Sequence, residues 1–186
     1  MIFRSITRSV SLAAAMSLLP SAFAESVSVQ QLQMEKEAVE LIGQLEEVAR
    51  DVQYNSERLH FLGREMKLSK WTHVHHLNQI RELVNDGLRP ALTRLTEIQP
   101  NLPDWKQKSI DEMLNVAKAL AADANSAIMA KNQNSQVPPA MNAEYREMIA
   151  RVSGHAQDLV KTSEAAGTYA AARQKAAEAG VNVPKH

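Results

Sequence analysis

Apolar residues recur at alternating spacings of three and four positions through most of this chain, and this period restricts the fold more than any other feature of its sequence. A repeat of about 3.6 residues places side chains on one face of an α-helix. The sequence therefore predicts four amphipathic helices. Their inward positions are Met34, Ala38, Ile42, Leu45, Ala49, Val52, Leu59 and Met66; Val74, Leu77, Ile80, Val84, Leu88, Ala91, Leu95 and Ile98; Ile110, Met113, Ala117, Leu120, Ala121, Ala124 and Ile128; and Met141, Tyr145, Met148, Val152, Ala156, Leu159, Ser163, Ala166, Ala170 and Ala177.

Breaks in the pattern predict the ends of these helices. Lys67-Leu68-Ser69 is the first expected turn, Pro100 to Pro103 the second, and the polar stretch from Lys131 to Pro139 the third. Pro90 lies inside the second stretch, where its missing N–H is expected to kink the helix rather than end it. Gly180 is the expected C-terminal cap of the last helix.

Short connections make successive helices antiparallel neighbours. We therefore expect one all-α domain over residues 25–180, an up-down-up-down four-helix bundle whose first and fourth helices are longer than the second and third. Their surplus turns should project at one end, beyond the Pro100 turn. The projecting part of the fourth helix, residues 169–179, is rich in alanine, which buries little surface. It is expected either to fray or to serve as a docking surface.

The beginning of the chain has the three parts of a secretory signal peptide. Arg4 and Arg8 form a positive region, residues 9–19 form an apolar run too short to cross a bilayer, and residues 22–24 read Ala-Phe-Ala. We expect cleavage after residue 24, so that the mature protein starts at Glu25 and is periplasmic or secreted. No later stretch reaches about 20 apolar residues, so no transmembrane segment is expected after cleavage. Residues 181–186 form a short tail.

Composition narrows the function. Lys plus Arg and Asp plus Glu number 21 each, so the chain lacks the basic excess typical of nucleic-acid-binding proteins. It contains no cysteine, which excludes disulfides, thiolate zinc sites, iron–sulfur clusters and covalently attached haem. There is no nucleophile elbow and no glycine-rich phosphate loop, so the sequence predicts a protein that is not an enzyme.

Histidines gather on both sides of the first expected turn. His60 and His76 lie on the borders of the inward faces at similar heights, His73 projects inward, and His75 points to solvent. Glu144 is expected at the same height on the fourth helix. His60, His73, His76 and Glu144 could bind a divalent metal, the only cofactor that this sequence suggests. The alternative is that these histidines simply border the bundle, since the Glu-x-x-His pairs of di-metal bundles do not occur here.

Three polar residues fall on or beside inward positions of the first two helices. Asn55, Ser56 and Arg81 are expected at matching heights, where they would form a polar layer. Such layers usually set the register between helices rather than perform catalysis.

Apolar residues also occur on the outward side of the first helix, at Leu32, Val39, Tyr54 and Phe61. A row of this kind indicates contact with a partner helix, with membrane headgroups or with a second copy of the chain. Residues 95–99, Leu-Thr-Glu-Ile-Gln, resemble the Leu-Thr-x-x-Gln motif of periplasmic envelope-stress chaperones, which are helical and carry it in repeated copies. The resemblance covers five residues and occurs once.

These observations predict an exported, non-enzymatic helical bundle that binds an unidentified protein or small molecule and no nucleic acid, with self-association left open. The alternative function is metal binding by the histidine cluster.

Overall fold

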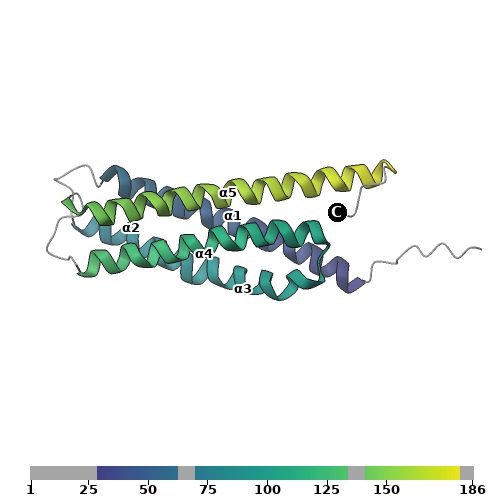
Figure 1. Cartoon of the computed structure of the whole chain (residues 1–186), viewed down its shortest axis with the longest axis horizontal. Helices are drawn as coiled ribbons and strands as arrows, with labels where there is room; N and C mark the ends of the chain where they lie inside the picture. The colour runs from purple at the N-terminus through teal and green to yellow at the C-terminus, as the bar shows by residue number, and fades with distance from the viewer. Residues whose placement is uncertain (1–28, 63–69, 134–140, 181–186) are drawn as a thin grey trace, which may run out of the picture.

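The computed structural model describes residues 29–62, 70–133 and 141–180, which are almost entirely helical and contain no β-strand (Figure 1). The helices are α1 (Val29–Leu62), α2 (Lys70–Glu82), the π-helical segment η1 (Leu83–Leu88), α3 (Arg89–Ile98), the 3₁₀ turn η2 (Gln99–Asn101), α4 (Asp104–Gln133) and α5 (Ala143–Glu178). Because α2, η1 and α3 are continuous, the described residues form four helical rods.

The first and last rods are the longest, as the sequence predicts. α1 has 34 residues and α5 has 36, against 30 in α4. The second rod has 13, 6 and 10 residues in its three parts. In Figure 1 the start of α1 and the end of α5 both lie beyond η2, at opposite edges of that end of the molecule.

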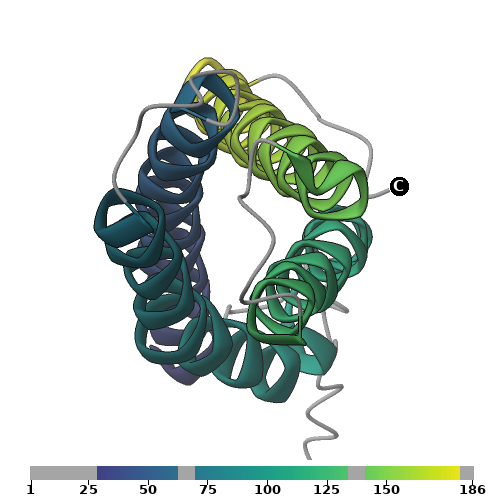
Figure 2. The same ribbon diagram turned by 90° about the vertical axis from the view of Figure 1, so that its left-hand side faces the viewer.

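Successive rods run in alternate directions in Figure 1. α1 packs along α5 on one side and along α2, η1 and α3 on the other, while α4 packs along α5 and also meets α2 and α3. The end-on view of Figure 2 shows the four rods around a common centre. Side chains with no exposed surface fill this centre, among them Leu45, Leu88, Leu120 and Leu159.

Most of the expected inward positions are buried, and three details of the pattern need correction. Met141 is 64% exposed because it precedes the first residue of α5, so the helical period does not apply to it. Ile149 and Val160 are buried although the expected stripe omits them. Lys131 was expected in a loop, but it lies in the last turn of α4 with 6% of its surface exposed.

Pro90 produces a π-helical segment and not a break. Since proline cannot donate a backbone hydrogen bond and its ring crowds the preceding turn, the helix widens over the residues before it. The N–H of Arg89 accordingly donates to the carbonyl of Val84, five residues back. Gly87 lies inside this segment, where a Cβ atom would be 2.7 Å from Cγ2 of Val48 on α1.

Side chains also tie the turn between α3 and α4. The Gln99 amide donates to the carbonyl of Gln107 at 3.0 Å and to a carboxylate oxygen of Asp111 at 2.7 Å, and the Gln107 amide donates to the carbonyl of Leu102 at 2.7 Å. Gln99 is the final residue of the Leu-Thr-Glu-Ile-Gln stretch. Its hydrogen bonds, together with the burial of Leu95, give this stretch a structural role in the described fold.

The ends of α4 and α5 follow the expected local chemistry. The carbonyl of Pro103 accepts the N–H of Lys106 at 2.8 Å, which starts α4. The side chain of Asn142 caps α5 by accepting the N–H of Tyr145 at 3.0 Å. Gly180 has φ of 70°, a left-handed conformation that glycine adopts without strain, so its expected role as C-terminal cap is confirmed.

Four predictions lie outside the described residues. They are the signal peptide at residues 1–24, the first turn at 67–69, the part of the third loop at 134–139 and the tail at 181–186.

Candidate functional site

The histidine cluster divides between the interior and the surface. His73 is 3% exposed, and His75 is on the surface, as the sequence predicts. His76 is half-buried, whereas His60 and Glu144 are exposed. In the part of the chain that the structure describes, no three His, Asp or Glu side chains lie close enough together to hold a metal ion. The metal site at His60, His73, His76 and Glu144 stays a prediction.

His76 is held by a hydrogen bond across two helices. The Asn55 amide nitrogen donates to the carbonyl of Asp51 at 2.8 Å, so its oxygen is the atom that meets Nδ1 of His76, at 2.8 Å. Nδ1 of His76 therefore carries the proton and Nε2 keeps its lone pair. Burial lowers the pKa of His76, and the positive charges of His75 and Arg58 lower it further. The ring is neutral at pH 7.

Asn55 and Ser56 are buried at 4% and 0% exposure, as expected for a polar layer. Arg81 is exposed, so its expected place in that layer is wrong. His76 partners Asn55 instead, because it lies on the side of α2 that faces α1. The Ser56 hydroxyl donates to the carbonyl of Gln53 within its own helix at 2.9 Å. The layer therefore joins α1 and α2 through one amide–imidazole pair.

His73 is packed against Tyr145 of α5, with ring centroids 6.3 Å apart and an interplanar angle of 64°. Nδ1 of His73 and the Tyr145 hydroxyl are both buried, and neither has a hydrogen-bond partner among the described residues. Burial lowers the pKa of His73, with further lowering from Lys131 and His76. Burial also raises the pKa of Tyr145. Both rings are therefore neutral at pH 7.

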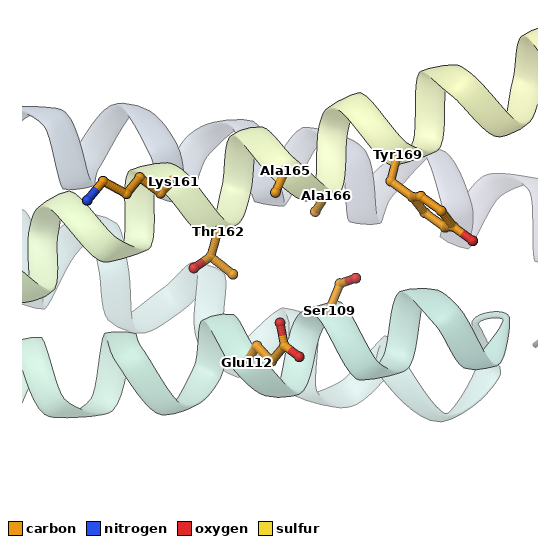
Figure 3. Close-up of a pocket in the computed structure, with 7 residues that line it drawn as sticks. All are labelled: Ser109, Glu112, Lys161, Thr162, Ala165, Ala166 and Tyr169. Atoms are coloured by element: carbon orange, nitrogen blue, oxygen red, sulfur yellow. The ribbon is translucent and has the colours of Figure 1, made fainter.

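A separate groove lies between α4 and α5, on the outer surface and nearer η2 than the histidines (Figure 3). Its volume is about 470 Å³. We call it the α4–α5 groove, and it is lined by Ser109, Glu112, Lys161, Thr162, Ala165, Ala166 and Tyr169. Figure 3 shows Ser109 and Glu112 on α4 facing the small side chains of α5, with Tyr169 at one end and Lys161 at the other.

The hydroxyl groups of this groove are engaged by the backbone. Ser109 donates to the carbonyl of Trp105 at 3.1 Å, and Thr162 donates to the carbonyl of Asp158 at 2.7 Å. Neither hydroxyl meets a histidine or a carboxylate, as an activated nucleophile would. Most lining side chains are small, so a ligand in this groove would approach the helix backbones closely.

An aromatic clasp formed by Trp105, Tyr169 and Arg173 closes the η2 end of the groove. The Trp105 and Tyr169 rings meet edge to face with centroids 5.1 Å apart. The Arg173 guanidinium carbon lies 5.3 Å from the Trp105 centroid and 5.6 Å from that of Tyr169. Lys106 lies under the clasp, 8% exposed, with its Nζ 2.7 Å from Oε2 of Glu35 on α1. These contacts fix the position of Tyr169.

An ionic cluster joins the same two helices farther from η2. Nε of Arg151 lies 3.0 Å from Oδ2 of Asp123, and Nε2 of His155 lies 3.3 Å from the same oxygen. The hydrogen bond to Asp123 raises the pKa of Arg151. The groove therefore lies between an ionic contact and an aromatic contact that both hold α4 against α5.

A second hollow, of about 520 Å³, lies between α1 and the second rod beside η1. It is lined by Asp51, Tyr54, Asn55, Gln79, Glu82, Leu83, Asp86 and Gly87. Its carboxylates form no metal-binding group with other residues of the described chain.

Sequence reasoning did not identify the α4–α5 groove or the aromatic clasp. The sequence predicts only that Tyr169 belongs to an alanine-rich projection, and it gives Trp105 no role. A signal was present in the sequence, because Trp105 lies near the start of the third helix and Tyr169 and Arg173 near the end of the fourth. Since these helices run in opposite directions, the three residues lie at the same height along the bundle. By contrast, the expected outward row on α1 is confirmed as exposed, since Leu32, Val39, Tyr54 and Phe61 are 50%, 54%, 54% and 60% exposed.

Comparisons with known proteins add no relative: no family model, no curated protein and no solved structure matches this chain. Among the described helices, none combines the length and hydrophobicity needed to cross a bilayer.

Proposed function

We propose that this chain is an exported, non-enzymatic protein of the periplasm or the cell exterior, folded as one up-down-up-down four-helix bundle, which binds a protein partner in the α4–α5 groove. The groove itself is the observation that carries the proposal. It is open, because Glu112, Lys161 and Ala165 on its rim are exposed. Sites for small molecules usually bury most of their ligand, whereas open grooves with small side chains accept a helix of another protein.

Rigid support for Tyr169 strengthens the proposal. Binding surfaces depend on a few well-positioned aromatic anchors, and ordering them beforehand reduces the cost of association. Tyr169 is 44% exposed while its ring is held by Trp105 and Arg173. It can therefore contact a partner without losing conformational freedom.

Filling the groove tests this function. Ala165 and Ala150 are both exposed alanines on α5, but only Ala165 lines the groove. Ala165→Arg should abolish capture of the partner from an envelope fraction, and Ala150→Arg should leave capture intact. Equal capture by both variants would remove the groove from consideration.

Metal binding is the second candidate function, supported by the orientation of His76. A histidine that ligates a metal usually donates its other ring N–H to an oxygen, as Nδ1 of His76 does to Asn55. Nε2 of His76 is thereby prepared as a ligand. The remaining ligands of the proposal are His60, His73 and Glu144, and the melting experiment below tests them.

A further inference from the structure

The two rims of the α4–α5 groove carry side chains of opposite charge. Glu112 is on the α4 rim and Lys161 on the α5 rim (Figure 3). Glu112 forms no ion pair within the described chain. Lys161 has one exposed contact, from Nζ to Oδ1 of Asp158 at 3.8 Å, which is worth little in water. Both charges are thus available to a partner.

The heights of the two charges follow from a contact between the helices. The Ser163 hydroxyl lies 3.5 Å from Sδ of Met113, so these two residues are level. Because α4 and α5 run in opposite directions, Glu112 and Lys161 lie about three residues apart along the bundle, or about 4.5 Å. A lysine side chain spans this offset.

This pattern is self-complementary under one kind of symmetry. A two-fold axis parallel to the helices would place α5 of one copy over α4 of the other at the same height. Lys161 of each copy would then meet Glu112 of the other, which gives two equivalent ion pairs. A two-fold axis across the helices would instead place α5 against α5 and α4 against α4, so Lys161 would not lie opposite Glu112. The charges therefore favour the parallel arrangement.

We propose that the α4–α5 groove is the interface of a parallel, two-fold homodimer in which Glu112 and Lys161 pair reciprocally between the copies. The proposal rests on the function proposed above, since it names a second copy of the chain as the partner. Ser109 and Ala165 permit close approach of the two helix pairs, and Tyr169 supplies the apolar contact at one end. Charge complementarity selects the partner and the direction of the pair.

Charge reversal tests the interface. The dissociation constant of the mature protein is measured by sedimentation equilibrium and by light scattering for the wild type, Glu112→Lys, Lys161→Glu and the double variant. Each single reversal places like charges opposite each other and should weaken dimerisation at least tenfold. The double variant restores opposite charges and should return to within about threefold of the wild type. Far-UV circular dichroism checks that every variant is folded.

Glu47→Lys and Lys118→Glu supply matched controls, because both residues are exposed, lie outside the groove and change the net charge by the same amounts. They should leave dimerisation unchanged. Four results would each overturn the homodimer: a wild type that is monomeric, single reversals that leave dimerisation unchanged, a double variant whose dimerisation does not recover, or controls that weaken dimerisation as much as the single reversals. A monomer whose partner capture is still lost in Ala165→Arg would overturn the homodimer alone and leave the docking groove intact.

Discussion

Burial lowers the pKa of His73, and Lys131 on α4 and His76 on α2 lower it further. In the unfolded chain the same imidazole titrates near about 6.5. As pH falls through that value, the imidazole is protonated in the unfolded state but not in the folded state, so the free energy of unfolding must decrease. Each unit by which folding lowers the pKa reduces the free energy of unfolding by at most about 1.4 kcal/mol, and the full reduction is reached when the pH is below both pKa values.

We therefore expect the free energy of unfolding to fall between pH 7.5 and pH 5.5 in urea titrations. His73→Leu should remove much of this pH dependence, because leucine has no proton to gain. His75→Leu is the matched control, since His75 is exposed on the same helix, and it should keep the wild-type dependence. An unchanged pH dependence in His73→Leu would show that another group is responsible.

The metal-binding alternative makes a distinct prediction for the same residues. If His60, His73, His76 and Glu144 bind Zn²⁺, saturating metal should raise the melting temperature, because a ligand of the folded state alone stabilises it by about 2.7 kcal/mol at 100 times its Kd. The gain should persist until pH falls below about 6.5, since coordination requires neutral imidazole.

Histidine substitutions locate the metal effect. His60→Ala or His76→Ala should abolish the rise in melting temperature, and His75→Ala should preserve it. A wild type with no rise at saturating Zn²⁺, or a rise that survives in all three variants, would contradict the metal site.

Gly87 offers a test of packing at the π-helical segment. An added Cβ would lie 2.7 Å from Cγ2 of Val48, whose branched side chain has little freedom to move. We expect Gly87→Ala to destabilise the protein by roughly 1–3 kcal/mol in urea unfolding. Gly43→Ala should instead stabilise by about 0.5–1 kcal/mol, because nothing lies within 4 Å of its added Cβ. If Gly87→Ala remains destabilising after Val48→Ala removes the contact, the close approach is not the cause.

At the scale of the helices, the apolar period predicted which faces are buried, because the spacing of apolar residues within one helix is enough to show which of its faces is apolar. Leu45, Leu88 and Leu159 illustrate this agreement. The errors occurred where a neighbouring helix or a helix end decides the outcome. Arg81 was expected on or beside an inward position and is exposed, and Met141 was expected on the inward face although it precedes the first residue of α5.

The candidate site was less predictable for the same reason. Pairing His76 with Asn55 requires the rotation of α2 about its axis relative to α1, which residue spacing does not specify. The aromatic clasp joins Trp105 to Tyr169 across two antiparallel helices, so it depends on their relative register. The continuation of the helix through Pro90 was predictable from the regular apolar pattern, but the π-helical segment before Pro90 was not.

The last turns of α5 should be the least protected helical segment of the monomer. Ala171 and Ala172 are exposed and Ala170 is half-buried, so apart from the contacts of Tyr169 and Arg173 with Trp105, little apolar surface holds residues 168–179 in place. We expect their amides to exchange with deuterium faster than those of residues 77–84, measured by mass spectrometry on the Glu112→Lys variant to avoid dimerisation. Equal protection in a demonstrated monomer would contradict this. Protection that appears only in the wild-type dimer would place these turns at the interface.

At the scale of the whole molecule, buried polar side chains join the helices at one end of the bundle and aromatic side chains join them at the other end. The histidine end joins α1, α2 and α5 through Asn55, His76, His73 and Tyr145. The opposite end joins α1, α4 and α5 through Lys106 and the clasp. The α4–α5 groove itself lies between the clasp and the contacts of Asp123 with Arg151 and His155, which both join α4 to α5. These contacts hold α4 against α5 beside the proposed docking groove in a chain that contains no cysteine and therefore no disulfide.

Export of this molecule is predicted by residues 1–24 alone and can be tested on them. Signal peptidase requires small side chains at the positions that Ala22 and Ala24 occupy, and the residue between them is not restricted in this way. Intact mass and N-terminal sequencing of the exported protein should therefore show Glu25 as the first residue. Ala24→Leu should block cleavage and accumulate the precursor, whereas Phe23→Leu should be processed normally. A soluble cytoplasmic protein that retains residues 1–24 would contradict the predicted compartment, because the apolar run would then belong to the folded protein and not to its export signal.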